Sequence, residues 1–229
     1  MQSAHPPTAP LARPASKEAV REMLDRIQWL GHGSFRIQGP PLIYLAPWRV
    51  TGGPFFADAI LVGHDHYYHC SPGDIVKLRG PHTVVVANSQ AAAFLGEGAQ
   101  VLRPWQSINV EEANIQAVPA YTPYRREHSF EAGGLGFVIS VDHFDIYYAG
   151  DTGVIPEMDR IRADIVMLPI SGRDTMTPLE AAEVVNRMRP YYAIPYGWGL
   201  QLGGSKGDAL AFRNAVDPNI EVVLMRQSR

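Results

Sequence analysis

The sequence has only one cysteine, Cys70, in 229 residues, so no disulfide bond can form within the chain. A chain without disulfides fits a reducing compartment. No apolar run is long enough to cross a bilayer, and the proline- and alanine-rich start lacks the apolar core of a signal peptide. We therefore expect a cytoplasmic protein without a membrane partner, with a disordered tail over residues 1–15 and one domain over residues 16–229.

The chain also has little net charge. The formal net charge is −3, charged residues make up 19% of the chain, and no group of Lys and Arg resembles a basic stripe. This composition argues against a nucleic-acid partner. The hydrophobic fraction of 46% is enough for a substantial core. We expect a small-molecule substrate as the partner, and the composition leaves a homo-oligomer open.

Local patterns predict mostly strands in the first half of the chain and alternating strands and helices in the second half. Ser16, Ser71 and Thr177 each precede a helical segment, as N-cap residues do. Residues 27–38 are typical of one strand, and a hairpin is predicted to turn near Asp142. Two sheets with helices outside fit both halves, and an ordinary α/β fold is the alternative.

A cluster of histidines follows a short apolar run that is typical of a buried strand. His64, His66 and His69 are three of the eight histidines and fall within six residues. A neutral imidazole is a common zinc ligand, and three such ligands leave a fourth position for water. The alternative is a polar loop whose histidines face solvent. Because the histidines cluster directly after a strand, we favour a metal site.

The cluster also belongs to an ordered series of motifs. GHDHYYHC resembles the HxHxDH signature of metallo-β-lactamase-fold hydrolases, and WLGHGSF precedes it. AVPAY is followed seven residues later by His128, and AGDT and TMTPLEAAE come next. Together these motifs resemble the branch of the metallo-β-lactamase superfamily that contains L-ascorbate-6-phosphate lactonase. The resemblance implies an α/β (α+β) fold, a four-layer αββα sandwich with metals held in loops at one edge of the sheets.

The resemblance also implies the ligands. It assigns His64, His66 and His128 to a first metal, and Asp151 and His69 to a second metal that Asp151 bridges. Each role has a plain alternative, since His128 could be an ordinary loop residue and Asp151 a turn former. His32 in the WLGHGSF motif is either a supporting residue or a hydrogen-bonded core group.

Three positions depart from the family pattern. Tyr68 stands at the aspartate of HxHxDH, Gly197 at a histidine that ends a later strand, and Ala46 at an aspartate that supports the metal loops. Two protein ligands rarely hold zinc tightly, because catalytic sites use three. We therefore predict that the second site is reduced and that one metal binds per chain, with zinc favoured and manganese or iron as alternatives.

The predicted function is hydrolysis of an ester, lactone or phosphoester by a metal-bound water. Asp151 would orient that water as the catalytic carboxylate, and Asp65, Tyr68 and Tyr196 would support the site or line its pocket. Tyr67 and Trp198 could line the pocket or pack in the core. The alternative is a catalytically inactive protein of this fold with a ligand-binding or regulatory role.

Overall fold

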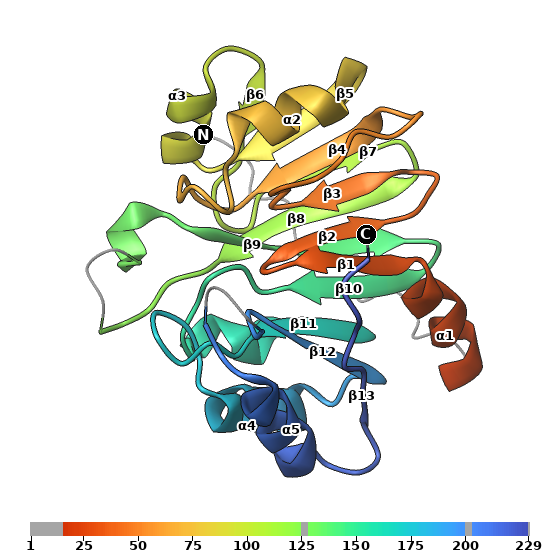
Figure 1. Cartoon of the computed structure of the whole chain (residues 1–229), viewed down its shortest axis with the longest axis vertical. Coiled ribbons are helices and arrows are strands. Elements are labelled where there is room, and N and C mark those ends of the chain that lie inside the picture. Colours follow the sequence, from red (N-terminus) through yellow and green to blue (C-terminus); the bar gives the residue numbers. More distant parts are fainter. Residues whose placement is uncertain (1–15, 125–127, 200–202, 229) are drawn as a thin grey trace, which may run out of the picture.

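The computed structural model describes residues 16–124, 128–199 and 203–228, so the tail predicted over residues 1–15 lies outside the described residues. Within the described residues, two β-sheets form the body of the molecule (Figure 1). Helices lie beside the first sheet at one end of Figure 1 and beside the second sheet at the other.

The first sheet contains six strands in the described part of the chain, and their order across the sheet follows the sequence. Its first three strands pair antiparallel, and the remaining strands pair parallel. The strands are β1 (Ile27–Gly31), β2 (Ser34–Ile37), β3 (Ile43–Leu45), β4 (Ala57–Val62), β5 (Arg79–Ala87) and β6 (Ala99–Val101).

The second sheet contains seven strands in the described residues, again in sequence order. Strands β7 to β10 pair antiparallel, and β10 to β13 pair parallel. The strands are β7 (Ser107–Val110), β8 (Ala113–Pro119), β9 (Leu135–Val141), β10 (Phe144–Tyr148), β11 (Ile165–Pro169), β12 (Tyr192–Tyr196) and β13 (Glu221–Val222).

The alternation of side chains along each strand separates the layers. In β4, Ala59 and Leu61 belong to the core between the two sheets, whereas Ile60 and Val62 belong to the core under the outer helices of the first sheet. A third apolar core lies between the second sheet and its helices. A sheet that is apolar on both faces needs cover on both sides. The predicted four-layer αββα sandwich is therefore confirmed.

Five α-helices and two short 3₁₀-helices connect the strands of the described chain. They are α1 (Lys17–Asp25), α2 (Pro72–Leu78), α3 (Ser89–Leu95), η1 (Phe130–Ala132), η2 (Pro156–Arg160), α4 (Pro178–Met188) and α5 (Lys206–Ala215). Helices α2 and α3 share the core on the outer face of the first sheet, and α4 and α5 share that of the second. No helix among the described residues is long and apolar enough to span a membrane.

All three predicted N-cap positions are confirmed. The Ser16 hydroxyl accepts a hydrogen bond from the Ala19 amide, and Thr177 forms a capping box with Glu180. Ser71 is the N-cap residue of α2, but its side chain makes no capping hydrogen bond. The helix that it precedes is instead held through Asp74, which accepts from the Arg49 amide at 2.8 Å.

The prediction of one strand over residues 27–38 is also wrong. The chain turns at His32 and Gly33, and β1 pairs antiparallel with β2. Gly31 has a φ of +112° and His32 a φ of +52°, so the backbone reverses direction within this motif. The turn places His32 at the end of β1, beside the loops that form the site.

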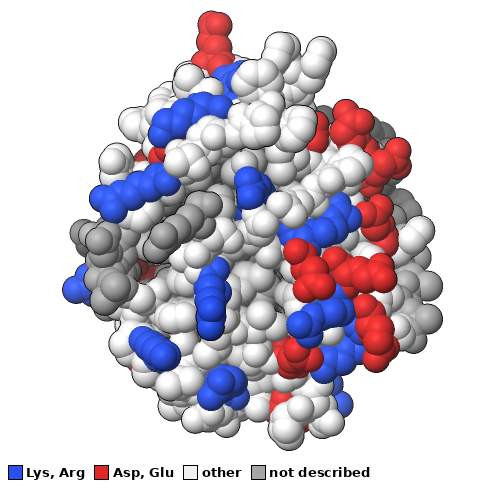
Figure 2. All heavy atoms as spheres, turned by 45° about the vertical axis from the view of Figure 1, so that its right-hand side comes forward, with Lys and Arg blue, Asp and Glu red and all other residues white. Residues whose placement is uncertain are grey.

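The surface in Figure 2 carries acidic and basic side chains close to one another. Ion pairs in this part of the chain tie α1 to distant segments, because Lys17 and Arg21 contact Glu221, and Arg26 contacts Asp142. Such exposed pairs contribute little stability individually. The candidate functional residues lie elsewhere, at the edge of the sheets where the histidines meet.

Candidate metal centre

The predicted metal ligands lie in loops that follow the ends of strands. Strand β4 leads into the loop with His64, His66 and His69, β8 leads toward His128, and β10 leads to Asp151. Strands β8 and β10 both pair antiparallel with β9, so they run in the same direction and end at the same edge. The carboxyl ends of parallel strands commonly carry binding sites for this reason.

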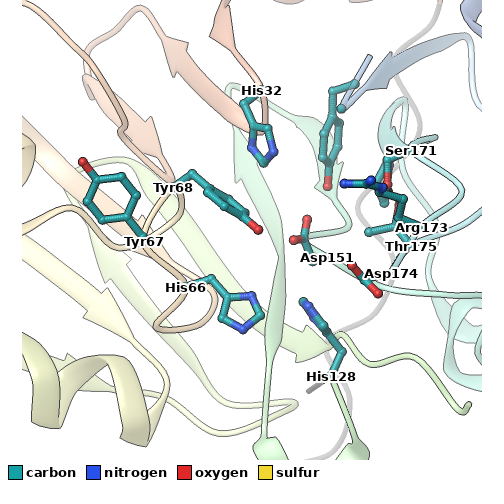
Figure 3. Close-up of a pocket in the computed structure, with 13 residues that line it drawn as sticks. His32, His66, Tyr67, Tyr68, His128, Asp151, Ser171, Arg173, Asp174 and Thr175 are labelled. Carbon is teal, nitrogen blue, oxygen red and sulfur yellow. Dashed lines mark hydrogen bonds between the residues drawn. The ribbon is translucent and has the colours of Figure 1, made fainter. Parts of the chain in front are cut away.

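Three imidazoles and one carboxylate converge at this edge. One ligand atom from each of His64, His66, His128 and Asp151 lies within 4.8 Å of the other three. The His66 ring centroid is 4.7 Å from those of both His64 and His128. Figure 3 shows His66, His128 and Asp151 directed toward a common point. This His/Asp group is positioned for a metal ion.

The surroundings of His64 fit a metal ligand. The residue is 9% exposed, and its buried Nε2 atom has no hydrogen-bond partner among the described residues. Burial holds the pKa of His64 well below its ordinary value, so the imidazole is neutral and keeps a lone pair for a metal. An unpaired buried nitrogen is unfavourable, and coordination would satisfy it. The group of four matches the His and carboxylate ligands that zinc accepts.

His69 lies beside Asp151 and outside this group of four. Its Nε2 atom is 3.1 Å from Oδ2 of Asp151, and both side chains are buried. Burial alone would raise the pKa of Asp151, but His69 and the neighbouring imidazoles hold it well below the ordinary value of an aspartate. Asp151 is therefore an ionised carboxylate whose position depends on His69.

An aromatic group formed by His32, Trp48 and Tyr68 borders the site on the side of His69. The His32 ring centroid is 4.7 Å from that of Tyr68 and 5.1 Å from that of His69. Its buried Nδ1 atom has no hydrogen-bond partner in the described chain. Burial, with His69 nearby, lowers the pKa of His32 to about 4. His32 is thus a neutral neighbour of the metal group.

The metal group faces a cavity of about 410 Å³. His32, Tyr68 and Tyr196 line it, and Figure 3 shows the Tyr68 hydroxyl directed to its interior. The sequence reasoning missed the loop that follows β11, which supplies the opposite wall. Its residues in the lining are Ser171, Arg173, Asp174 and Thr175. Their position just after a parallel strand is the signal that could have identified them.

The family model for the Beta-lactamase superfamily domain matches residues 26–197, which include all the residues of the metal group. The chain belongs to the metallo-β-lactamase superfamily. The match begins at the end of α1, so it contains both sheets except β13. The loops that carry the histidines thus lie within the region matched by the family model.

Similar sequences from other organisms support this assignment. A UPF0173 metal-dependent hydrolase of Methanopyrus kandleri is 32% identical over 195 residues, which cover 76% of this chain and 84% of that protein. A UPF0173 metal-dependent hydrolase of Thermococcus onnurineus is 28% identical over 219 residues, which cover 88% of this chain and 96% of that protein. The resemblance thus extends over most of the superfamily member.

Solved structures agree with the fold. A Parabacteroides distasonis protein, named as a candidate metal-dependent hydrolase, superimposes with a TM-score of 0.78 at 28% identity, over 89% of this chain and 93% of that one. The metallo hydrolase Igni18 of Ignicoccus hospitalis gives a TM-score of 0.74 at 20% identity, over 89% and 95% of the two chains. The second likeness concerns the fold alone.

Gly197 leaves this superfamily member without a side chain at one wall of the cavity. It follows β12 with a φ of +74°, and an added Cβ atom would find Ser171 Cβ as its nearest neighbour, at 3.8 Å. The open space at this position adjoins the loop with Arg173. The cavity therefore extends to the Cα atom of Gly197.

The remaining predicted pocket residues fall into different surroundings. Asp65 is exposed and borders a smaller cavity with His64, outside the 410 Å³ cavity. The buried Tyr196 hydroxyl donates a hydrogen bond to the Gly150 carbonyl at 2.6 Å, next to Asp151. Tyr67 lines the cavity, whereas Trp198 stacks on Trp29 with centroids 5.2 Å apart.

Proposed function

We propose that this chain is a metal-dependent hydrolase that acts on an ester, a lactone or a phosphoester. The convergence of His64, His66, His128 and Asp151 within 4.8 Å carries this proposal. The names of the UPF0173 relatives support it, because they describe metal-dependent hydrolases. The similarity covers 84% and 96% of those proteins. The cavity beside the metal group supplies room for a substrate.

The chain's residues hold the metal and orient the reacting groups. His64, His66 and His128 offer neutral imidazoles, and Asp151 completes the group. A divalent metal held by these residues would supply Lewis-acid chemistry, lowering the pKa of a water and polarising a substrate oxygen. The neighbouring imidazoles hold the pKa of Asp151 below its ordinary value, so its carboxylate would accept a hydrogen bond from the attacking water and orient it.

We propose that one metal, zinc, binds per chain. Tyr68 and Gly197 stand where the family pattern has an aspartate and a histidine, so two second-site ligands are replaced. The two that remain, His69 and Asp151, lie against each other at 3.1 Å. Two protein ligands rarely hold zinc. Manganese or iron would suit the same mixed donor set.

The substrate class follows from the same resemblance. The motif series resembles the L-ascorbate-6-phosphate lactonase-like branch, and this resemblance supports a lactone or a phosphoester. The cavity wall opposite His66 contributes hydroxyl and guanidinium groups, which suit an oxygen-rich substrate. Screening of phosphoesters, lactones and carboxylic esters with the zinc-loaded protein would identify the class.

The experiment that tests the proposal is elemental analysis of the protein purified without added metal or chelator, repeated after loading with zinc and with manganese. About one metal per chain would support the reduced site. Two fully bound metals would refute the one-metal proposal but leave the hydrolase. No metal, even after loading, would refute the metal-dependent hydrolase.

A binding protein without catalysis is the second candidate. Tyr68 and Gly197 favour it, because they stand where the family pattern has two metal ligands. The chain nevertheless keeps a cavity of about 410 Å³. The two candidates differ in a single readout. Zinc-dependent turnover that disappears in His66→Ala favours the hydrolase, and ligand binding without turnover across the substrate classes favours the binding protein.

A further inference from the structure

The cavity has two chemically different walls. One contains the metal ligands His66, His128 and Asp151, and the other is the loop after β11. Figure 3 shows the guanidinium of Arg173 directed into the cavity from this second wall, across from His66 and Tyr68. The second wall is not explained by metal binding, because its side chains lie outside the group of four ligands.

Hydrogen bonds fix this loop next to the metal ligands. The Thr122 hydroxyl donates to the Asp174 carbonyl at 2.7 Å, and the Met176 amide donates to the carbonyl of Thr152, the residue after Asp151, at 3.1 Å. The hydroxyls of Ser171 and Thr175 lie 2.8 Å apart and close the loop. These hydrogen bonds hold the backbone of the loop that carries Arg173 against the Thr122 and Asp151 loops.

The charges that line the cavity favour an anion once a divalent metal is bound. Arg173 is the only Lys or Arg among the described lining residues, and Asp151 and Asp174 are the carboxylates. The two carboxylates and one guanidinium leave one negative charge, which a divalent cation converts to one positive charge. A cavity with a net charge of one sign attracts ligands with a charge of the opposite sign.

On these grounds we propose that the substrate carries an anionic oxygen group and that Arg173 binds this group from the wall opposite the metal ligands. The inference rests on the proposed function and names its substrate class. A guanidinium has five N–H donors in a planar fork, so it can contact a protein carboxylate and two substrate oxygens at the same time. The hydroxyls of Ser171 and Thr175 lie in the same wall and can donate to further oxygens.

Gly197 makes room for this group. The space beyond its Cα atom is bordered by Ser171, whose Cβ atom would be the nearest contact of an added Cβ atom, at 3.8 Å. A larger side chain at this position would take up part of the cavity, because Gly197 is one of the residues that line it. Glycine at this position therefore leaves open space in the cavity, beside Ser171, for the anionic part of the substrate.

The test is calorimetric binding of inorganic phosphate, and separately of acetate, to the zinc-loaded protein. We expect Arg173→Gln to weaken binding of the preferred anion at least tenfold, and Arg173→Lys to weaken it less, because it keeps the charge but loses the fork. The control is Arg103→Gln, which changes an exposed arginine outside the cavity lining and should bind as the wild type does.

Binding of either probe that depends on Arg173 supports the proposal, and the tighter probe identifies a phosphate- or carboxylate-bearing substrate. Equal binding by wild type and Arg173→Gln, or no binding of either probe, overturns it. Zinc content is measured in the same samples. Normal zinc content with no effect of Arg173 rejects this inference alone, whereas absent zinc rejects the proposed function.

Discussion

The Nε2 atom of His69 lies 3.1 Å from Oδ2 of Asp151, and both side chains are buried. Asp151 also lies 3.7 Å from His64 Nε2, so it contacts two imidazoles through the same oxygen. The closer imidazole, that of His69, contacts the carboxylate but lies outside the group of four ligand atoms within 4.8 Å. This relationship assigns different roles to two histidines that look alike in the sequence.

His64 and His69 should therefore respond differently to replacement. We expect His64→Ala to lose most of the bound zinc, because it removes one of four converging ligands. His69→Ala should weaken zinc binding about 10- to 100-fold, as loss of a residue that supports a ligand does. Competition with a chelator measures both affinities. His82→Ala, in an exposed part of β5, is the control, and equal losses in the first two variants would contradict the assignment.

Tyr196 supports the turn that carries Asp151. Its hydroxyl donates to the buried Gly150 carbonyl at 2.6 Å, so Tyr196→Phe leaves that carbonyl unpaired. We expect a loss of about 1–3 kcal/mol in the free energy of unfolding, measured by urea denaturation. Tyr147→Phe is the matched control. The buried Tyr147 hydroxyl has no partner among the described residues, so its removal should be neutral or stabilising, and a reversed order would contradict this account.

Most of the fold could be predicted from the sequence because its signals are local. Side-chain alternation, the Thr177 capping box and the turn at Asp142 each act within a few residues, and the structure confirms them. The hairpin at His32 was missed because an apolar pattern continues through it. Its turn depends on positive φ angles at Gly31 and His32, which hydrophobic periodicity does not report.

The candidate site was only partly visible in the sequence. The motif series located His64, His66, His128 and Asp151, and the structure brings these four together. Arg173 could not be found in this way, because its place opposite the histidines depends on how the loop after β11 folds against the Thr122 and Asp151 loops. Contacts between distant segments carry no local pattern.

Gly33 is packed too closely against the site to accept a side chain. An added Cβ atom would lie 2.6 Å from His69 Cε1 and 3.1 Å from the Tyr148 hydroxyl. We expect Gly33→Ala to lower the free energy of unfolding by about 1–3 kcal/mol and to weaken zinc binding by displacing His69 from Asp151. The control is Gly53→Ala, where an added Cβ atom meets nothing within 4 Å. Equal thermal stability of the two variants would refute the packing argument.

Stability of the metal-free protein should fall as the pH falls from 6.5 to 4. Folding lowers the pKa of His32 from 6.5 to about 4, so the unfolded chain binds the proton more readily between these pH values. His32 would contribute a loss of about 3 kcal/mol over this range. We expect His32→Asn, which tolerates a positive φ, to make the pH dependence shallower in urea titrations of chelator-treated protein. An unchanged slope would exclude His32 as a source.

The reduction to one metal should be reversible by restoring the replaced ligands. Tyr68→Asp combined with Gly197→His supplies the two side chains that the family pattern has, and an added Cβ atom at residue 197 has its nearest neighbour at 3.8 Å. Histidine also tolerates the φ of +74° better than most residues. We expect zinc to rise from about one to about two per chain, measured by elemental analysis and native mass spectrometry.

The control for this gain is Tyr68→Asp combined with Gly199→His. Gly199 is exposed, has a φ of +115°, and an added Cβ atom there meets nothing within 4 Å, so the new histidine also has a positive φ but lies outside the cavity lining. This variant should stay at about one zinc per chain. If the first variant also stays at one, Tyr68 and Gly197 are not what limits the metal count. If the wild type already binds two, His69 and Asp151 hold the second metal without them.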